Sequence, residues 1–395
     1  MKRFFILSTV LLCLLSCGAE EYSLFVENPS DVDRYGEILE VEIPDAESLI
    51  VLDASGSELP SQVTYDGKLL FPVTLPAHGS SHYTLVRGER APLDTIAVGR
   101  MYPERLDDIA WENDRIGFRA YGKEAGKGGA KFYGYDIFTK RGEEPVLDYL
   151  YEVECDLEYK SIIKELRAQG DHEGALVLQS IRSYHLDHGS GMDYYTVGPT
   201  LGCGTAALIQ DGKNLYADYY DTYEILDKGG LRFTMKLTYD PMQVGDDTVV
   251  EERIITLDAA THFNRVEVNY RNLSKPSEII VGLVMRDEGK DHQITDGSLA
   301  YAEPVHKYGW QTYDAVLYPE GMTATKKLFD EQEMAEHGGA FGYVQAVGTV
   351  QPGEPFVYYM GAGWNRWGFP TPQSWFGYVA EREAVLAAPL TYSLR

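Results

Sequence analysis

Hydrophobic and polar residues alternate in short runs over the first part of the chain, from residue 22 to residue 92. Runs such as Ile38-Leu39-Glu40-Val41-Glu42-Ile43 are separated by turn signals such as Asp66-Gly67. Alternation with a period of two places one face of a strand on a core and the other face in water. Several such strands between Gly and Asp turns predict a small β-sandwich domain over residues 22–92.

Longer runs of the same kind follow residue 104, whereas residues 91–103 lack the pattern and are expected to form a linker. The clearest predicted strands cover residues 116–121, 133–138, 206–209, 231–239, 248–257, 263–272, 279–286, 340–350 and 355–361. Few helices are expected, with candidates at 158–168 and 329–337, each followed by a glycine. We therefore predict a mainly β chain, in which residues 104–395 form a large antiparallel two-sheet supersandwich of the galactose-mutarotase-like type. This second domain is the expected catalytic domain.

The N-terminus has the pattern of an export signal. A basic start is followed by an apolar run over residues 4–15, which is shorter than the roughly 20 residues of a membrane-spanning helix. The run ends in Leu14-Leu15-Ser16-Cys17-Gly18, a cysteine between small residues, as in lipoprotein processing sites. We predict a signal peptide over residues 1–16, lipidation of Cys17 and a tether over 17–21. The protein is thus expected in the cell envelope, anchored in outer-membrane lipid and facing the periplasm or the outside.

The amino-acid composition argues against some classes of binding partner. The formal net charge is −26, and no basic run interrupts it, which argues against nucleic acid as a partner. No glycine-rich phosphate loop follows a strand, so no nucleotide is expected either. The 29 tyrosines suit strands and also suit surfaces that bind sugars. Cys155 and Cys203 belong to no CxxC motif, and the sequence leaves open whether they form a disulfide.

The densest cluster of polar residues with catalytic potential is the segment 183–198, which glycines mark as a loop. Its histidines offer a general acid or base near neutral pH, and its tyrosines offer a proton donor. A divalent metal is a second interpretation, since imidazole and carboxylate are common ligands. The candidate catalytic residues are His185, Asp187, His188, Asp193, Tyr194 and Tyr195, with Tyr184 as a substrate-binding residue. The candidate metal ligands are His185, Asp187, His188 and Asp193, and no cofactor is certain.

Three further clusters contain candidate substrate-binding residues. In the segment 285–292, Arg286 suits a carboxylate clamp and Glu288 lies beside it. In the segment 361–369, Trp364 and Trp367 either stack on a sugar or fill the core. Arg119 lies on the strand face opposite Phe118 and is expected to point into a cleft, after a structural hairpin turn at residues 113–114.

These segments together resemble the bacterial domain-of-unknown-function family 4861 over residues 106–395. The resemblance is carried by residues 112–119, residues 134–141 and Gly361-Ala362-Gly363-Trp364, and above all by the His185-x-Asp187-His188-Gly189 block. Members of that family are found among genes for the breakdown of uronic-acid-containing polysaccharides, and their fold looks mutarotase-like. The resemblance implies a uronate-containing glycan as the partner and does not define a reaction.

Three functions follow as hypotheses. The leading one is a polysaccharide lyase that cleaves uronate glycans by β-elimination, which needs a base, an acid and a cation to neutralise the carboxylate. The expected residues are His185 or His188 as the base, Tyr194 or Tyr195 as the acid, and Arg119 or Arg286 as the neutralising cation. The first alternative is a glycoside hydrolase, which needs two carboxyl groups. The other is a surface glycan-binding lipoprotein without catalysis, and an epimerase is a minor option.

Overall fold

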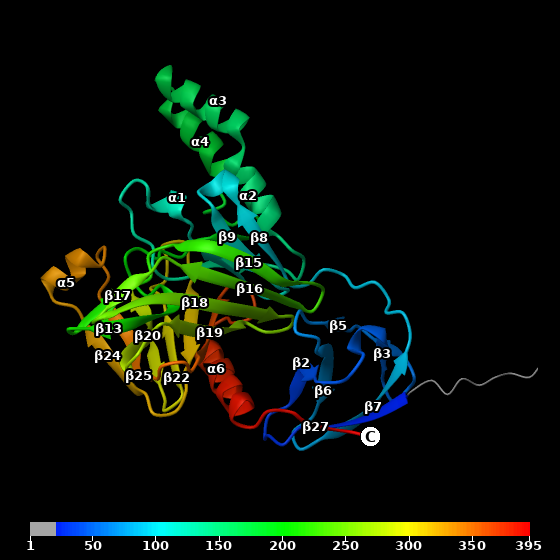
Figure 1. Cartoon of the computed structure of the whole chain (residues 1–395). Helices are drawn as coiled ribbons and strands as arrows, with labels where there is room; N and C mark the ends of the chain where they lie inside the picture. The colour runs from blue at the N-terminus through cyan, green and yellow to red at the C-terminus, as the bar shows by residue number, and fades with distance from the viewer. Residues whose placement is uncertain (1–20) are drawn as a thin grey trace, which may run out of the picture.

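The computed structural model describes residues 21–395 and shows a mainly β chain, as predicted (Figure 1). The predicted signal peptide, the predicted lipidation site Cys17 and all but the last residue of the predicted tether lie outside the described residues. Glu21, the last residue of that tether, is the first residue of strand β1. Within residues 21–395, no helix has both the length and the apolar character that crossing a membrane requires.

The first unit is a small sandwich of two antiparallel sheets. One sheet contains β27 (Thr391–Leu394), β1 (Glu21–Glu27), β7 (Ser80–Arg87), β3 (Leu49–Leu52) and β4 (Glu58–Leu59). The other contains β2 (Arg34–Val41), β6 (Leu69–Leu75) and β5 (Gln62–Val63). Alternate residues such as Leu24, Val26 and Phe71 are fully buried between the sheets, as the period of two requires. The end of the chain completes this unit, since Leu394 pairs with Leu24, although the sequence assigned residues up to 395 to the second domain.

The second unit contains three sheets around one large core. The largest sheet contains β15 (Tyr220–Lys228), β16 (Arg232–Tyr239), β18 (Asp247–Asp258), β19 (Phe263–Arg271), β26 (Phe356–Trp364), β23 (Thr312–Leu317), β22 (Ser298–Ala302) and β21 (His292–Ile294), with β17 (Met242–Val244) beside β18. The second contains β14 (Lys213–Leu215), β13 (Cys203–Gln210), β20 (Ser277–Met285), β25 (Gly342–Val350) and β24 (Thr323–Leu328). The third contains β12 (Gly191–Asp193), β11 (Asp136–Lys140), β10 (Gly117–Ala120), β9 (Asp108–Glu112) and β8 (Val98–Tyr102).

The expected linker is shorter than predicted, because its second half forms β8. Val98 pairs with Glu112 and Tyr102 pairs with Asp108, so this strand closes one edge of the third sheet. Gly99 lies in the middle of β8, where a Cβ atom would come within 2.6 Å of the Trp111 side chain. The glycine that allows this close packing also interrupts the alternation from which a strand is predicted.

The two helices predicted from the sequence are present as α3 (Leu157–Ala168) and α5 (Glu331–Glu336). The expectation that helices are few was wrong, because residues 21–395 contain four more: α1 (Lys123–Gly126), α2 (Leu147–Cys155), α4 (His172–Arg182) and α6 (Pro372–Ala387). Figure 1 shows that α3 and α4 project from the body of the molecule as a hairpin, while α2 lies against its base. Two 3₁₀ turns, Ala46–Ser48 and Pro103–Arg105, complete the elements.

Polar contacts join the two units. Arg232 of β16 forms ion pairs with Glu40 of the small sandwich at 2.5 Å and with Asp258 at 2.6 Å. The backbone N–H of Tyr65 donates to the Asp227 carboxylate at 2.7 Å. The small sandwich is therefore fixed against the largest sheet.

Candidate functional site

Arg119 lies at the centre of a buried network of acidic and tyrosine side chains. Its guanidinium donates to Asp193 Oδ2 at 2.9 Å and to the hydroxyl groups of Tyr184 and Tyr121 at 3.1 Å each. It also forms a close ion pair with Asp136. Strand register explains the arrangement, since Arg119 pairs with Asp136 across β10 and β11.

The prediction that Arg119 points into a cleft is therefore wrong, because this side chain is 3 % exposed. Asp193 and Tyr184, each 1 % exposed, belong to the same network and are not available to a substrate or a metal. Burial raises the pKa of nearby Asp108 to about 6, against the opposing effect of Arg119.

The remaining polar residues of the predicted catalytic loop shape the loop itself. The Asp187 carboxylate accepts hydrogen bonds from the backbone N–H groups of Gly189 and Gly191 and pairs with Arg141 at 2.8 Å. Gly191 has a φ of 110°, and a Cβ atom there would lie 1.9 Å from the Thr139 carbonyl oxygen, so the tight entry into β12 requires glycine. His188 is exposed and lies 3.2 Å from the Ser183 carbonyl oxygen.

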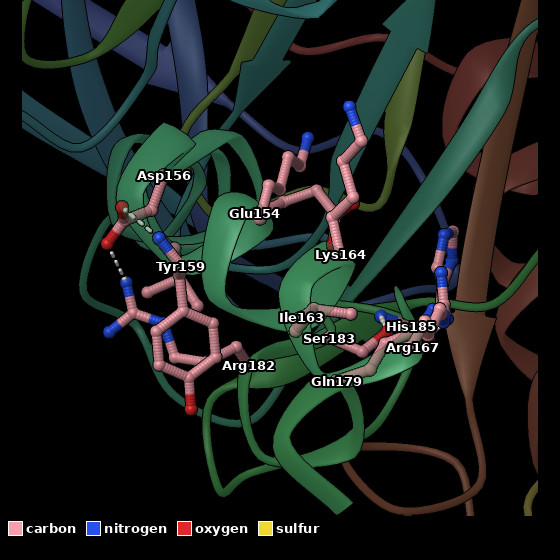
Figure 2. A pocket seen from close by; sticks show the side chains of 12 residues that line it. Glu154, Asp156, Tyr159, Ile163, Lys164, Arg167, Gln179, Arg182, Ser183 and His185 are labelled. Carbon is pink, nitrogen blue, oxygen red and sulfur yellow. Dashed lines mark hydrogen bonds and ion pairs between the residues drawn. The ribbon is translucent and has the colours of Figure 1, made fainter. Parts of the chain in front are cut away.

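The structure brings no metal site together at this loop. Across residues 21–395, three or more His, Cys, Asp or Glu side chains are nowhere grouped so as to hold a metal ion. The four predicted ligands fail because Asp193 is buried against Arg119 and Asp187 is engaged by Arg141 and two backbone amides. His185 faces a pocket at the base of the α3–α4 hairpin instead (Figure 2).

Three of the residues selected from the sequence do meet in one cavity. Tyr194, Tyr195 and Arg286 line a cavity of about 260 Å³, together with residues that follow β22. Tyr194 and Tyr195 come directly after β12, and Arg286 comes directly after β20. The complete lining is Tyr194, Tyr195, Thr196, Arg286, Glu303, Pro304 and Thr312.

Arg286 and Glu303 form the polar part of this cavity. The Arg286 guanidinium donates to the Val197 carbonyl oxygen at 2.9 Å and to that of Thr196, while its buried Nε has no partner among residues 21–395. Glu303 is 8 % exposed, and its Oε1 also lacks a partner within the part of the chain that the structure describes. Burial raises the pKa of Glu303 to about 8, Arg286 opposes the shift and Asp287 adds to it, so this carboxyl group keeps its proton at neutral pH.

A second buried carboxyl group lies behind the cavity wall. Asp314 of β23 is fully buried, and its Oδ2 accepts a hydrogen bond from the Tyr195 hydroxyl at 3.0 Å. Burial and the nearby Glu303 raise the pKa of Asp314 well above its usual range. Glu303 and Asp314 are thus two buried carboxyl groups that keep their protons, and carboxyl groups with strongly shifted pKa values are typical of functional sites.

Aromatic rings stand next to the cavity, on the loop between β22 and β23. The Tyr194 ring lies 5.1 Å from that of His306 and 5.7 Å from that of Trp310, and His306 stacks on Trp310 at 4.6 Å. Desolvation and Lys307 lower the pKa of His306, so its imidazole is neutral at pH 7. Arg366 donates to the Tyr308 carbonyl oxygen at 2.9 Å and so holds this loop.

Other predicted substrate-binding residues lie elsewhere. Trp364 is 1 % exposed and lies at the end of β26 with the Arg141 guanidinium 5.4 Å from its ring, so the interpretation as a sugar platform is wrong for this residue. Trp367 is half-buried and forms an isolated β-bridge with Trp364. Glu288 is exposed and does not line the cavity. Its backbone carbonyl oxygen accepts a hydrogen bond from the Lys326 ammonium.

Sequence reasoning missed Glu303, His306, Trp310 and Asp314. The first three share the segment Glu303-Pro304-Val305-His306-Lys307-Tyr308-Gly309-Trp310, which joins two apolar strands and is as rich in polar and aromatic residues as the loop that was selected. Asp314 has a different signal, a charged residue inside the apolar run 312–317. Cys155 and Cys203 are both free thiols, which answers the question of a disulfide between them.

Comparison with known proteins places the chain in a family. The family model described as Domain of unknown function (DUF4861) matches residues 26–391. The chain belongs to this family. The match reaches further towards the N-terminus than the resemblance over 106–395 and includes the small sandwich. This DUF4861 chain is also 26% identical to "Uncharacterized protein P7" of Formosa agariphila over 423 residues. The alignment covers 100% of this chain and 99% of that protein.

Two solved structures share the fold. One is described as an α-mannosidase from Enterococcus faecalis V583, with a TM-score of 0.50 and 9% identity over 95% of this chain. The other is described as a protein in the glycosyl hydrolase family 38 from Enterococcus faecalis, with a TM-score of 0.51 and 8% identity over 95% of this chain. The DUF4861 chain spans less than half of each, 46% and 47%. At this level of identity the likeness concerns the fold alone.

Proposed function

We propose that this DUF4861 protein is a carbohydrate-active enzyme that cleaves a uronate-containing glycan by β-elimination at the cavity between Arg286 and Glu303. The observation that carries the proposal is the convergence of a guanidinium, a protonated carboxyl group and two tyrosines in one cavity. Fold neighbours described as an α-mannosidase and a glycosyl hydrolase support a carbohydrate substrate.

The cavity suits the carboxylate of a uronate. Arg286 supplies positive charge and a free Nε–H, and Glu303 supplies a carboxylic acid proton. Both groups stabilise the extra negative charge that reaches the substrate carboxyl group when the C5 proton leaves. Trp310 and Tyr194 offer ring faces and edges to the apolar C–H bonds of the sugar.

The elimination then needs one base and one acid. The neutral His306 imidazole takes the C5 proton, the electron pair forms the C4=C5 double bond, and the C4–O bond breaks. Tyr194, whose pKa is raised by burial, keeps its proton and gives it to the leaving oxygen. His306 Nδ1 accepts a long hydrogen bond from the Tyr308 backbone N–H at 3.3 Å, so base catalysis requires this bond to open or the ring to change tautomer.

Hydrolysis is the second candidate, because one carboxyl group, Glu303, lines the cavity and a second, Asp314, is buried behind its wall. Glu303 then acts as the general acid, and Asp314 supplies the second carboxyl group that hydrolysis needs once it loses its proton. The two reactions differ in their product, since hydrolysis leaves saturated sugar ends and elimination leaves an unsaturated uronate.

Variants test the site directly. Arg286→Gln is expected to lower kcat/KM by roughly 10²–10³-fold, because it removes charge stabilisation from the transition state. Arg265→Gln is a matched control on the largest sheet, where Arg265 pairs with Glu267 and does not line the cavity. Equal activity of Arg286→Gln and the wild type on a substrate that the protein turns over would contradict the proposed role.

We also propose that Cys17 carries a lipid anchor that holds the protein in the cell envelope. The residue pattern Leu14-Leu15-Ser16-Cys17-Gly18 supports this proposal. Cells grown with a labelled fatty acid are expected to label the wild-type protein and not Cys17→Ala. Label on the alanine variant, or none on the wild type, would refute the anchor.

A further inference from the structure

The base of the α3–α4 hairpin contains a pocket of about 380 Å³ that the proposed elimination does not use (Figure 2). Its lining includes the four permanent cations Lys160, Lys164, Arg167 and Arg182, together with His185. Only Glu154 and Asp156 oppose them. In a chain with a formal net charge of −26, this local excess of positive charge runs against the field of the whole protein.

The cations are arranged so that three of them are available. Lys160, Lys164 and Arg167 follow at i, i+4 and i+7 along α3 and therefore share one face of the helix. In the part of the chain that the structure describes, neither lysine has a carboxylate within ion-pair distance. Arg167 donates only to the neutral Gln179 Oε1, at 2.6 Å.

Arg182 differs from these three residues. Its guanidinium pairs with Asp156 at 2.7 Å and lies over the Tyr159 ring at 4.6 Å. Figure 2 shows this ion pair at one end of the pocket and His185 at the other. The ion pair neutralises the positive charge at its end of the pocket and links the start of α3 to the end of α4. The end of the pocket near His185 keeps its positive charge.

The pocket and the cavity are joined by one short segment. His185 follows α4, and its Nδ1 lies 2.8 Å from the Asp193 carbonyl oxygen. The next residues, Tyr194 and Tyr195, line the cavity with Arg286. His185 at the pocket is thus one hydrogen bond and one residue away from Tyr194 at the cavity, a separation that one oligosaccharide can span.

We propose that the pocket is a subsite for an anionic substituent, a carboxylate or a sulfate ester, on the glycan that the cavity processes. The inference rests on the proposed function for the identity of the glycan. Arg167 supplies a planar fork for the anion and the two lysines supply point charges. Val153 and Ile163 add apolar surface for the sugar ring.

The test is calorimetric binding to the full chain. The triple variant Lys160→Gln, Lys164→Gln, Arg167→Gln is compared with the control Lys213→Gln, Lys228→Gln, Lys275→Gln, which removes three exposed charges elsewhere. The probes are an oligogalacturonate, a sulfated galactan oligosaccharide and a neutral cello-oligosaccharide. The pocket variant is expected to bind one or both anionic probes at least roughly tenfold more weakly, since one charge-assisted contact is worth about that factor. The anionic probe with the larger loss identifies the substituent.

Two results would overturn the subsite: an equal loss in the pocket variant and the control, or no loss in either. Arg286→Gln, measured in parallel, separates this inference from the proposed function. Binding that depends on the pocket, without turnover of any uronate glycan, supports the subsite and refutes the elimination. Normal turnover with unchanged binding in the pocket variant refutes the subsite and leaves the elimination standing.

Discussion

At the scale of single residues, Glu303 has the environment that most affects chemistry. Its carboxyl group is almost fully buried, lines the same cavity as Arg286 and interacts electrostatically with the buried Asp314. Burial destabilises the carboxylate form of Glu303 more than the positive charge of Arg286 stabilises it, so the native state prefers the protonated acid. A group of this kind can hold a substrate carboxylate or donate a proton, and both proposed reactions use it.

The raised pKa of Glu303 predicts a pH dependence of stability. The folded-state pKa is about 8 and the ordinary value is 4.5, so the native state binds this proton more tightly than the unfolded state. The stabilisation that this more tightly bound proton contributes is fully present below about pH 4.5 and is lost as the pH rises to about 8. Glu303→Gln stays neutral, so its free energy of unfolding, relative to that of the wild type, is expected to increase across this window. Denaturant titrations at several pH values measure the difference, and parallel curves would show that Glu303 is ionised in the native state.

The buried network around Arg119 predicts that loss of this side chain strongly destabilises the folded protein. Arg119→Ala leaves Asp136, Asp193 and Asp108 buried without their shared cation, and is expected to lower the free energy of unfolding by about 3–5 kcal/mol. Arg115→Ala is the matched control on the same hairpin, because Arg115 is partly exposed and pairs with Glu143 at the surface. The control is expected to cost at most about 1 kcal/mol. Equal losses in urea titrations would contradict the assignment of Arg119 to a buried network.

Residue types and spacing allowed part of the candidate site to be predicted. Tyr194, Tyr195 and Arg286 were selected because a glycine-bounded loop and a strand end display side chains. The sequence does not show which polar residues are consumed by packing, so Arg119 and Asp193 looked as available as Arg286. Glu303 and Asp314 require knowledge of the pairing between β22 and β23, which brings them to the same end of the large sheet.

At the scale of elements, strands were easier to predict than helices. The predicted strand over 248–257 lies within β18, and the one over 231–239 nearly coincides with β16, because alternation is strong where one face is buried. Helix α6 was missed although Thr371 and Ser374 form a capping box and Pro372 starts the first turn. Its Trp375 is fully buried against Phe263 and Tyr313 of the large sheet.

We expect the fold to tolerate removal of the α3–α4 hairpin. Helix α3 has no buried residue and α4 buries only Ala175, so the hairpin adds little to the core. The Arg182 guanidinium pairs with the Asp156 carboxylate at 2.7 Å, so the two ends of the hairpin are no further apart than these two side chains reach, which a short Gly-Ser linker can span. Replacing residues 157–182 is expected to leave the melting temperature within a few degrees of the wild type while removing the basic pocket. Thermal circular dichroism checks this, and loss of a cooperative transition would show that the hairpin supports the core.

At the scale of the whole molecule, the end of the chain ties the two units together. Strand β27 returns to pair with β1, and Arg34 of the small sandwich donates to the Ala388 carbonyl oxygen at 2.6 Å. Removal of residues 391–395 is expected to expose the edge of β1 and the core around Leu24, which costs about 2–3 kcal/mol. Calorimetry is expected to show one transition for the full chain and an earlier, separate transition of the small sandwich for the truncated chain. A single unshifted transition in the truncated chain would contradict this role.

Product analysis tests the central claim, β-elimination at the Arg286–Glu303 cavity, most directly. The full chain and Arg286→Gln are incubated with a panel of plant and algal uronate oligosaccharides, and products are followed by ultraviolet absorbance and mass spectrometry. The account predicts products that absorb through a C4=C5 double bond conjugated with the carboxyl group, formed without addition of water, and their loss in Arg286→Gln. Products with saturated ends, formed with addition of water, would contradict elimination and favour hydrolysis by the Glu303–Asp314 pair.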